Sequence, residues 1–440
     1  MSELDLTIRN VYSKMSGGDS IYASLGKKAF LFSKDDLERS WATSSPNSYV
    51  DADIEPKESD LRIFRDALII NPLVQTGLCH PSLGSDPEFF ISDGDGKVIP
   101  AFTFLPEKTP STPIFWDGYQ CEVTPSPRNC IVEHATLLCV LLKDALRLAK
   151  QKNKDAQFLE TDTIPISLKE LKKKPTNFTA LGCDPSSNAY GMEGEIPADS
   201  TTLPFRFAGG HIHFGWEPLS GDNKNQKQID VMLKAVRDLD KILAIWSVGA
   251  AQSFEKMKER RRHYGLAGEF RLPSHGLEYR TLSPFWLKSP EAYHITFDLA
   301  RAVFRGSLMG LLDFWVADMG EVIRIINEYD QRGAQKILEV NKAFFIHLAK
   351  GANHNYLFAS NRVDRTFRLG LRDKIGELMW KAGIEGIESV TPKKTITENW
   401  LLEENISVGG KTWGRYAATI LEYPVLYVEA VNSPNRWDRS

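Results

Sequence analysis

The sequence predicts an α+β protein whose sheet is mainly antiparallel, covered by helices, and followed by a helical C-terminal region. Short apolar and aromatic runs are separated by turn sequences such as "DGDGK" (93–97) and "PSHG" (273–276), which is typical of hairpins. Longer segments with apolar residues at helical spacing interrupt these runs and dominate from residue 290 onward. The regular strand–helix alternation that indicates a parallel sheet is missing, so α+β is the favoured class.

The first half of the chain predicts an extension, then strands, then a helix. Residues 1–76 show mixed signals and no recognisable chemistry, and we interpret them as an N-terminal extension. "PEFFIS" (87–92) predicts a strand, and "KVIPAFTF" (97–104) predicts its return strand after the turn. "TPIFWDGYQCEVTPSP" (112–127) predicts one longer strand that ends in prolines. Residues 128–150 predict an amphipathic helix.

Strand signals return in the second half, at 204–216 and in a hairpin at 268–286. Between them, residues 226–265 predict a long helical segment, and residues 291–315 and 367–384 predict further helices. We therefore expect three regions along the chain: the extension (1–76), a core (77–288) with a helical insert at about 128–175, and a mainly helical region (289–440) packed on the core.

Amino-acid composition and charge limit which binding partners and which cellular compartment the sequence predicts. The chain has 54 Lys and Arg against 57 Asp and Glu, a formal charge of −3, so bulk charge predicts no nucleic-acid or anionic-membrane partner. Its five cysteines form no CxxC pair, which favours reduced thiols. The first residues lack the apolar segment of a secretory signal, and no apolar run reaches the roughly 18–20 residues of a membrane span. We expect a cytoplasmic protein.

Four predicted strands each carry functional polar residues on one face, because residues two apart in a strand point to the same side. Their neighbours on the other face are largely apolar, for example Phe89, Cys121 and Ile212. A single half-buried strand often shows such alternation with its polar face in water. Here, however, the polar sets are carboxylates, imidazoles and a guanidinium rather than the usual surface residues. The pairs are Asp86 and Glu88, Gln120 and Glu122, His211 and His213, and Glu278 and Arg280.

If these strands are neighbours in one sheet, their carboxylates form a cluster that needs cations. A site with many carboxylates and few nitrogen ligands favours Mg²⁺ or Mn²⁺ over zinc. Mg²⁺ usually keeps waters and phosphate oxygens as ligands, so the cluster indicates nucleotide phosphates bridged by metal. No Walker-type GxxxxGK[ST] and no GxGxxG after a strand is present, so such a nucleotide would bind elsewhere than on a P-loop or Rossmann site.

Arginines close to the fourth strand are candidates for phosphate contacts. Arg260, Arg261 and Arg262 precede the small-residue stretch "YGLAG", and Arg271 precedes Glu278 on the same predicted hairpin. The arginine fork matches phosphate geometry, although a run of basic residues is also common at a solvated helix end.

The motifs together resemble those of the glutamine synthetase-like carboxylate–amine ligases. "SDPEFF", "DGYQCEV", "GGHIHFG" and "GLEYRTLS" are similar to the ExE, GQxE, GxHxHxS and ExR strands of that superfamily, in the same order. With "GCDPSSNAY" and "RRHYGLAGEFR" between them, the motif sequences are most similar to those of the phage and bacterial COOH–NH2 ligases of type 2, the phiEco32-like amidoligases. The resemblance covers roughly residues 80–288 and would place a phage-encoded chain in the host cytoplasm.

This resemblance implies a glutamine synthetase-like fold with a curved antiparallel sheet, and ATP-dependent formation of an amide through an acyl phosphate. It implies two or three divalent cations, Mg²⁺ or Mn²⁺, between the carboxylates and the phosphates of ATP. The implied metal ligands are Asp86, Glu88, Glu122, His211 and Glu278. The implied nucleotide contacts are His213, Arg271 and one of Arg261 or Arg262. Arg280 would hold the transferred phosphoryl group or the substrate carboxylate.

Three positions depart from the family pattern. Asp86 stands where a glutamate is expected, Gly215 stands where a serine follows the second histidine, and Asp117 is the nearest candidate for a further metal carboxylate upstream of Glu122. A base must also deprotonate the attacking ammonium, and Glu193 or Glu195 in "YGMEGEIP" is a candidate, although acidic loop residues are usually solvated.

Two other enzyme functions use the same residues, and a third alternative is a binding or structural protein that keeps the fold without activity, which the complete set of acidic, histidine and arginine residues disfavours. A phosphotransferase on the same fold, of the guanidino-kinase type, would need the cations and arginines but no amine. An HxH metallohydrolase would use His211 and His213 together as zinc ligands. The sequence predicts carboxylate and amine substrates without identifying either of them.

Overall fold

Two antiparallel sheets share one continuous stretch of chain. Strand β3 (Ser82–Ser85) is the edge of a five-stranded sheet, and β4 (Glu88–Ser92) begins three residues later inside a four-stranded sheet. The first sheet has the order β3-β11-β13-β12-β9, and the second has the order β5-β6-β4-β7. Every pairing between the described strands is antiparallel, so the predicted α+β class is confirmed. The glutamine synthetase-like arrangement stays an expectation.

The computed structural model describes residues 20–25, 28–33, 81–129, 131–173, 186–194, 199–216, 219–255, 258–309, 312, 315–346, 348, 375–400, 402–403, 405–408 and 411–414. The other strands of the two sheets are β5 (Ile114–Asp117), β6 (Gln120–Val123), β7 (Gln157–Leu159), β9 (Ser187–Asn188), β11 (Ile212–Gly215), β12 (Glu269–Arg271) and β13 (Gly276–Tyr279). Three two-stranded pairs complete the strands: β1 (Ser20–Leu25) with β2 (Lys28–Ser33), β8 (Thr163–Pro165) with β10 (Phe205–Phe207), and β14 (Asn405–Val408) with β15 (Lys411–Gly414).

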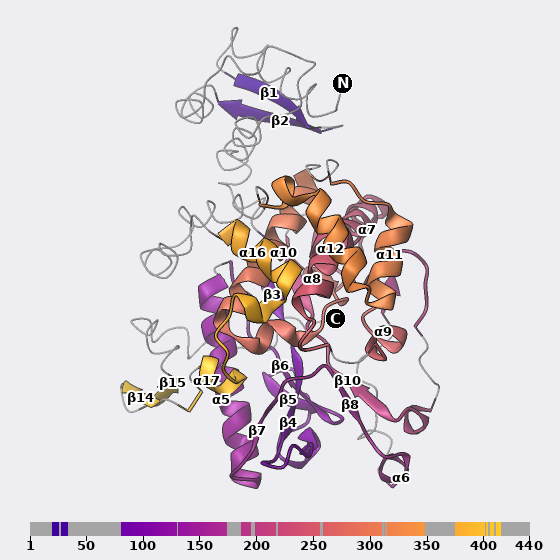
Figure 1. The fold of residues 1–440 in the computed structure, drawn as a ribbon. Coiled ribbons are helices and arrows are strands. Elements are labelled where there is room, and N and C mark those ends of the chain that lie inside the picture. The colour runs from indigo at the N-terminus through magenta and orange to yellow at the C-terminus, as the bar shows by residue number, and fades with distance from the viewer. Residues whose placement is uncertain are drawn as a thin grey trace.

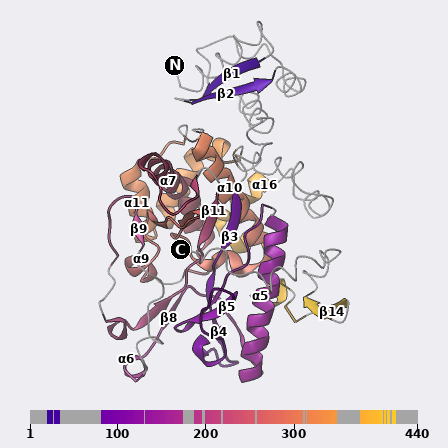
Figure 2. The same ribbon diagram turned by 180° about the vertical axis from the view of Figure 1, so that it is seen from behind.

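In the view of Figure 1, most of the described helices lie above β4, β5 and β6, and one long helix runs along the side of these strands. The described helices are α5 (Ile131–Lys152), α6 (Leu168–Leu171), α7 (Gln226–Leu239), α8 (Ile245–Ala250), α9 (Arg260–His263), α10 (Pro290–Met309), α11 (Met319–Glu328), α12 (Gln331–Val340), α16 (Ile375–Glu385) and α17 (Ile396–Asn399). A π-helical turn, Asp240–Ala244, joins α7 to α8. Short 3₁₀ turns lie at Ala101–Thr103, Ser200–Thr202, Pro284–Lys288 and Ile387–Ser389. Seen from behind, β3 lies beside β11, and α5 runs along the edge of the strands (Figure 2).

Two of the strand predictions at 97–127 are wrong, for a local reason. Only Val98 of the expected return strand pairs, with Ser92, and the chain then enters a 3₁₀ turn after Pro100, which has no N–H to donate. The expected long strand is a hairpin, β5–β6, with Gly118 and Tyr119 as its loop. Gly118 has φ +63°, a backbone conformation that glycine adopts without strain.

One hydrophobic core runs beneath both sheets and continues into the helices. It extends from Leu83 to Leu402 and so crosses the expected region boundary at residue 288. Helix α10 packs on α5 and α7, and α5 contacts β3 and β6. Cys121 and Cys139 are buried free thiols in this core, and the other three cysteines lie outside the described residues.

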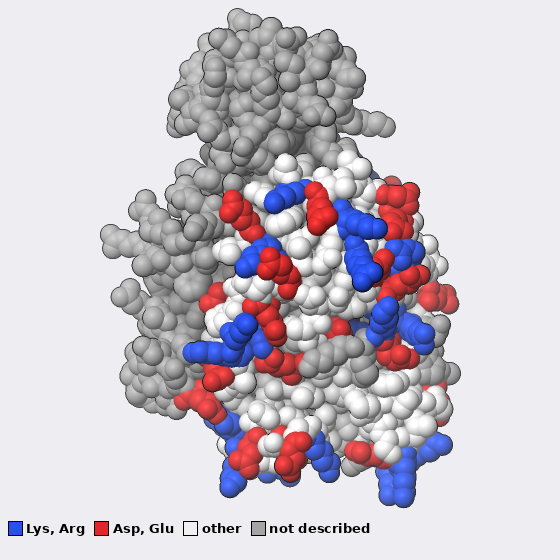
Figure 3. Space-filling model, in the orientation of Figure 1, with Lys and Arg blue, Asp and Glu red and all other residues white. Residues whose placement is uncertain are grey.

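Surface charge is mixed on the face that Figure 3 displays. Basic and acidic side chains lie interspersed over its described part rather than gathered by sign. Among the described residues, no helix is both long enough and apolar enough to cross a membrane.

Candidate active site

The four polar strand faces predicted from the sequence meet where the two sheets join. Glu88 on β4 pairs directly with Glu122 on β6, and His213 on β11 pairs directly with Glu278 on β13. Directly paired residues have side chains on the same face of a sheet. Their apolar neighbours face the other way, and Phe89, Cys121, Val123, Ile212, Phe214 and Tyr279 all belong to the core. The alternation predicted from the sequence is therefore confirmed.

The segment Asp86–Pro87–Glu88 connects the two sheets. It follows the last residue of β3 and enters β4, and its backbone is held on both sides. The Glu88 N–H donates to the Gly209 carbonyl at 2.9 Å, and the Pro87 carbonyl accepts from the Val123 N–H at 3.3 Å. As a result, Asp86 lies with the first sheet and Glu88 lies with the second.

Three carboxylates form a compact acidic group in the second sheet. Oxygens of Glu88, Asp117 and Glu122, here called the Glu88 group, lie within 4.8 Å of one another. Burial, followed by the nearby Asp117 charge, raises the pKa of Glu88 to about 8. Burial and the other carboxylates likewise raise the pKa of Glu122 well above its ordinary value. Burial raises the pKa of Asp117 despite the nearby Lys108, Arg280 and Arg271. Three negative charges at this spacing are not stable together without a cation.

Polar contacts hold the Glu88 group in place. Glu88 Oε2 accepts from the Gly209 N–H at 2.6 Å, and Lys108 Nζ lies 4.0 Å from Glu122 Oε1. Gln120 donates to the Phe207 carbonyl at 2.8 Å, which joins the β5–β6 hairpin to the chain just before Gly209 and Gly210. By contrast, Asp117 Oδ2 is buried and accepts no hydrogen bond from the described residues. That oxygen is the one that a cation would satisfy.

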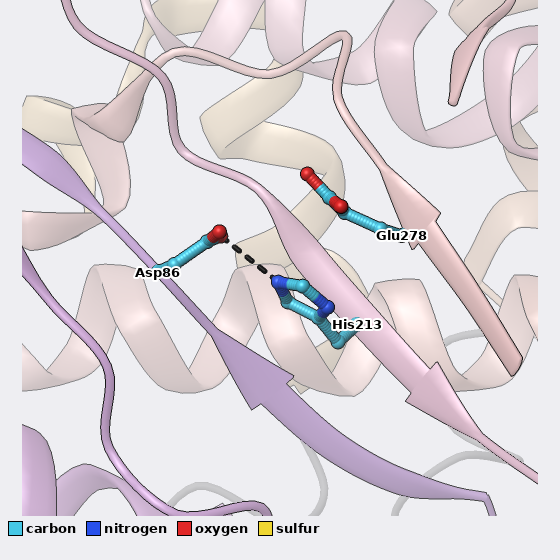
Figure 4. A group of neighbouring side chains, drawn as sticks. All are labelled: Asp86, His213 and Glu278. Atoms are coloured by element: carbon cyan, nitrogen blue, oxygen red, sulfur yellow. Dashed lines mark ion pairs between the residues drawn. The ribbon is translucent and has the colours of Figure 1, made fainter. Parts of the chain in front are cut away.

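A second group lies in the first sheet and combines two carboxylates with an imidazole. Asp86, His213 and Glu278, here called the Asp86 group, also have ligand atoms within 4.8 Å of one another. Figure 4 shows their side chains directed toward one another from three neighbouring segments, with His213 Nε2 3.0 Å from Asp86 Oδ1. His211 joins them from the side: its Nδ1 lies 3.2 Å from Asp86 Oδ1 and 3.6 Å from Glu278 Oε1.

Electrostatics keeps the carboxylates of the Asp86 group ionised. Burial opposes ionisation of Asp86, but His213 and His211 outweigh it and hold its pKa well below the ordinary value. Burial also opposes ionisation of Glu278, but Arg280 outweighs it and lowers that pKa. Burial and then Arg280 lower the pKa of His211 to about 4, so this imidazole is neutral at pH 7. For His213, burial lowers the pKa, but Asp86 outweighs it and the net shift is upward.

Two arginines flank Glu278. Arg280 is 1% exposed and donates through Nη1 to Glu278 Oε1, while its Nε donates to Ser186 Oγ at 2.9 Å. Arg271 pairs with Glu278 across β12 and β13, its Nη1 lies 3.9 Å from Glu278 Oε2, and its side chain is 25% exposed. Arg271 is thus the more accessible of the two, and both lie beside the strand that carries Glu278, as the sequence predicts.

The structure does not bring every predicted residue to these groups. Arg261 is 1% exposed, donates to both oxygens of Glu255 at 2.8 and 3.1 Å, and also donates to the Gly265 and Thr281 carbonyls. Its guanidinium therefore belongs to the packing behind β13. The Arg262 side chain is 65% exposed and pairs with Glu259. Glu193 lies in an exposed loop, and Glu195 lies outside the described residues. The roles predicted for Arg261, Arg262 and Glu195 stay predictions.

The donor atoms fit divalent cations of the Mg²⁺ and Mn²⁺ type. The Glu88 group offers carboxylate oxygens alone, including the buried Asp117 Oδ2 that lacks a hydrogen bond. The Asp86 group offers two carboxylates and one imidazole. Hard oxygen ligands with few nitrogens suit Mg²⁺ and Mn²⁺, whereas structural zinc favours thiolates and several imidazoles.

Comparison with known proteins agrees with the motifs. Residues 195–309 match the family model of the phage phiEco32-like COOH-NH2 ligases of type 2. The matched family is the one that the sequence motifs resemble. It covers β10 to α10, and so includes His211, His213 and Glu278 together with Arg271 and Arg280, whereas the Glu88 group and Asp86 precede it. No curated protein and no solved structure matches the chain.

Sequence reasoning missed two members of the site. Tyr264 lies among Glu88, His211 and Arg280, and His275 Nε2 lies 3.2 Å from His213 Nδ1. Both residues stand inside informative stretches of the sequence, "RRHYGLAGEFR" and "PSHG". The signal that could have found His275 is its place opposite the strand that carries His213, in the turn of the adjacent hairpin.

Proposed function

We propose that this protein is an ATP- and Mg²⁺-dependent carboxylate–amine ligase that activates a carboxylate as an acyl phosphate and joins it to an amine. The observation that carries the proposal is the pair of carboxylate groups at the junction of two sheets, with Arg271 and Arg280 at one end. Carboxylates on antiparallel strands are also what the resemblance to the glutamine synthetase-like ligases implies. The family match over residues 195–309 supports the ligase class independently.

The two groups would hold the divalent cations, with Glu88, Asp117 and Glu122 at one site and Asp86, His213 and Glu278 at the other. When bound, the cations would neutralise the phosphate oxygens of ATP and the charge that develops during phosphoryl transfer. The chain's own residues have separate tasks. Arg280 is fixed by Glu278 and Ser186, so its guanidinium is already oriented before any substrate arrives. Arg271, which is partly exposed, can reach an anionic group that enters from solvent.

The reaction proposed for this site balances in two steps. A carboxylate oxygen of the substrate attacks the γ-phosphorus of ATP, the bond to the bridging oxygen breaks, and ADP leaves. The deprotonated amine then attacks the acyl carbon, and inorganic phosphate leaves with one of the original carboxylate oxygens. The amine loses its protons to a base, for which Glu195 is the predicted candidate. The protein contributes mainly alignment and charge neutralisation.

The proposal is tested by incubating the protein with ATP, Mg²⁺ and pools of carboxylates and amines, followed by mass spectrometry. We expect an amide product together with ADP and phosphate. With a substrate carboxylate labelled with ¹⁸O, one labelled oxygen should appear in the phosphate. A phosphorylated product without amide would instead support the phosphotransferase. Metal-dependent hydrolysis without ATP would support the HxH hydrolase.

A matched pair of variants ties the activity to the site. Glu278→Gln removes the carboxylate shared by Asp86, His211 and Arg280, and we expect it to abolish metal-dependent ATP turnover while the fold is retained. Glu321→Gln changes an exposed carboxylate on α11, paired with Arg324, and should keep wild-type turnover. Equal turnover in the two variants would place the active site elsewhere.

A further inference from the structure

The hydroxyl of Tyr264 lies between the two candidate cation groups. It lies 3.4 Å from Glu88 Oε1, it accepts from Arg280 Nη2 at 3.2 Å, and it contacts His211 Nε2. The other ring nitrogen of His211 faces Asp86 and Glu278. A chain of close polar contacts therefore runs from Glu88 through Tyr264 and His211 to Asp86. The Tyr264 ring also lies under Arg280, with its centroid 5.5 Å from the guanidinium carbon.

Gly209 leaves the space that this contact needs. A Cβ at this position would lie 2.3 Å from His211 Nε2 and 2.6 Å from Tyr264 Oη, so any larger residue would push the ring and the phenol apart. The Gly209 N–H meanwhile donates to Glu88 Oε2 at 2.6 Å. Gly209 thus leaves room for the Tyr264 hydroxyl and also holds the Glu88 carboxylate through its N–H.

The phenol has one proton, and two of its neighbours among the described residues, Glu88 and His211, can accept it. Because Arg280 only donates, its bond to Tyr264 occupies a lone pair of the hydroxyl and leaves the phenolic proton for Glu88 or His211. If His211 carries its proton on Nδ1, that proton lies on the side of Asp86, whose Oδ1 is 3.2 Å away, and Nε2 accepts from the phenol. If His211 carries its proton on Nε2, the ring donates to the phenol oxygen, and the phenolic proton is free to point to Glu88.

We propose that Tyr264 is a positioning residue that couples the two candidate cation groups through the tautomer of His211. The proposal rests on the proposed function, in which both groups bind divalent cations. A cation held by Asp86, His213 and Glu278 would lie beside His211 Nδ1, which faces Asp86 and Glu278, so it disfavours a proton on that nitrogen and selects the Nε2–H tautomer. The phenolic proton then turns to Glu88 and supports its carboxylate as a ligand of the second cation. In this tautomer change the His211 proton moves from one ring nitrogen to the other, and the imidazole itself gains or loses no proton.

Stepwise cation binding tests the coupling. Mn²⁺ alone is titrated into the intact protein by calorimetry, and the affinities of the first and second ions are compared. Tyr264→Phe removes the hydroxyl and keeps the ring. We expect the ratio of second to first affinity to fall about tenfold in this variant, within the usual range of coupling between sites. Tyr119→Phe is the control, because its hydroxyl donates to Glu170 at 3.0 Å, outside both groups, and it should keep the wild-type ratio.

A spectroscopic readout on the wild-type protein does not depend on any variant of Tyr264. In protein labelled with ¹⁵N-histidine, with His211 assigned by comparison with His211→Gln, saturation with Mg²⁺ should move the ring proton from Nδ1 to Nε2. An unchanged tautomer, or an unchanged affinity ratio in Tyr264→Phe, overturns the coupling and leaves the proposed ligase in place. Failure of the wild-type protein to bind any Mn²⁺ or Mg²⁺ overturns the proposed function and the coupling with it.

Discussion

Replacing Glu88 with glutamine should stabilise the protein when no cation is present. Glu88 is 2% exposed, and burial together with the Asp117 charge raises its pKa to about 8 from an ordinary value of 4.5. At pH 7 the unfolded side chain is ionised, whereas the folded one must take up a proton. At about 1.4 kcal/mol per pH unit, this costs the folded state about 3 kcal/mol. Glutamine keeps the oxygen that accepts from the Gly209 N–H and removes the cost.

The sign of the pH dependence follows from the same shift. Because the folded pKa is above the unfolded one, the stability that Glu88 contributes is present below pH 4.5 and is lost as pH rises toward about 8. In EDTA, the melting temperature of the wild-type protein should fall across this window. Glu88→Gln should show a smaller fall and a melting temperature several degrees higher at pH 7. Added Mg²⁺ should raise the melting temperature of the wild-type protein more than that of the variant.

A buried carboxylate that already has its counter-charge provides the control. Glu255 is 4% exposed and receives two hydrogen bonds from Arg261, so Glu255→Gln should lower the melting temperature whether or not Mg²⁺ is present. The measurement is a thermal melt of the three proteins at pH 5, 7 and 8.5 with EDTA or Mg²⁺. The reasoning is refuted if Glu88→Gln melts below the wild-type protein in EDTA at pH 7, or if the wild-type melting temperature does not fall between pH 5 and 8.

Two further predictions concern Asp117 as a cation ligand and the packing of α8 against α16. Asp117→Asn should weaken Mn²⁺ binding at the Glu88 group at least about tenfold and leave the Asp86 group intact, which a calorimetric titration would show as one retained site. Gly249→Ala should lower the melting temperature by an amount that corresponds to about 1–3 kcal/mol, because the new Cβ would lie 1.8 Å from the Gly383 carbonyl oxygen where α8 meets α16. Gly320→Ala on α11, where the nearest atom is Asp318 Oδ1 at 3.1 Å, should change it much less, and equal effects would contradict the packing argument.

Alternation of polar and apolar residues is sufficient to predict which face of each strand carries the functional side chains. A strand buried on one face repeats every two residues, so the alternation alone assigns Glu88, Glu122, His213 and Glu278 to the polar faces of their strands. Direct pairing of Glu88 with Glu122 and of His213 with Glu278 bears this out. Periodicity carries no information on which strands are neighbours, and that information comes from the order of the motifs.

The contacts that the sequence does not predict depend on turns and on long-range packing. The sequence does not decide whether Asp117 is a metal ligand, because its segment predicts one long strand. The dipeptide Asp117-Gly118 is nevertheless a strong hairpin signal. The hairpin places Asp117 opposite Gln120 and brings it into the Glu88 group. Tyr264 contacts His211 from 53 positions away in the chain, and no local pattern predicts a contact of that kind. Arg261 stands in a basic run typical of a surface, yet Glu255 and two carbonyls hold it inside the protein.

The short connection between β3 and β4 sets a covalent limit on the site. Asp86 and Glu88 belong to different groups but are separated by a single proline, so their Cα atoms cannot lie more than about 7 Å apart whatever the rest of the chain does. The spacing between the two groups is therefore bounded by bond lengths, while the remaining ligands depend on how separate strands pack. A substitution that loosens the packing would change the distances to the ligands on the other strands. The limit on the distance between Asp86 and Glu88 would stay the same. Insertion of one residue between Asp86 and Glu88 would increase the maximum distance between their Cα atoms without altering any side chain of the site.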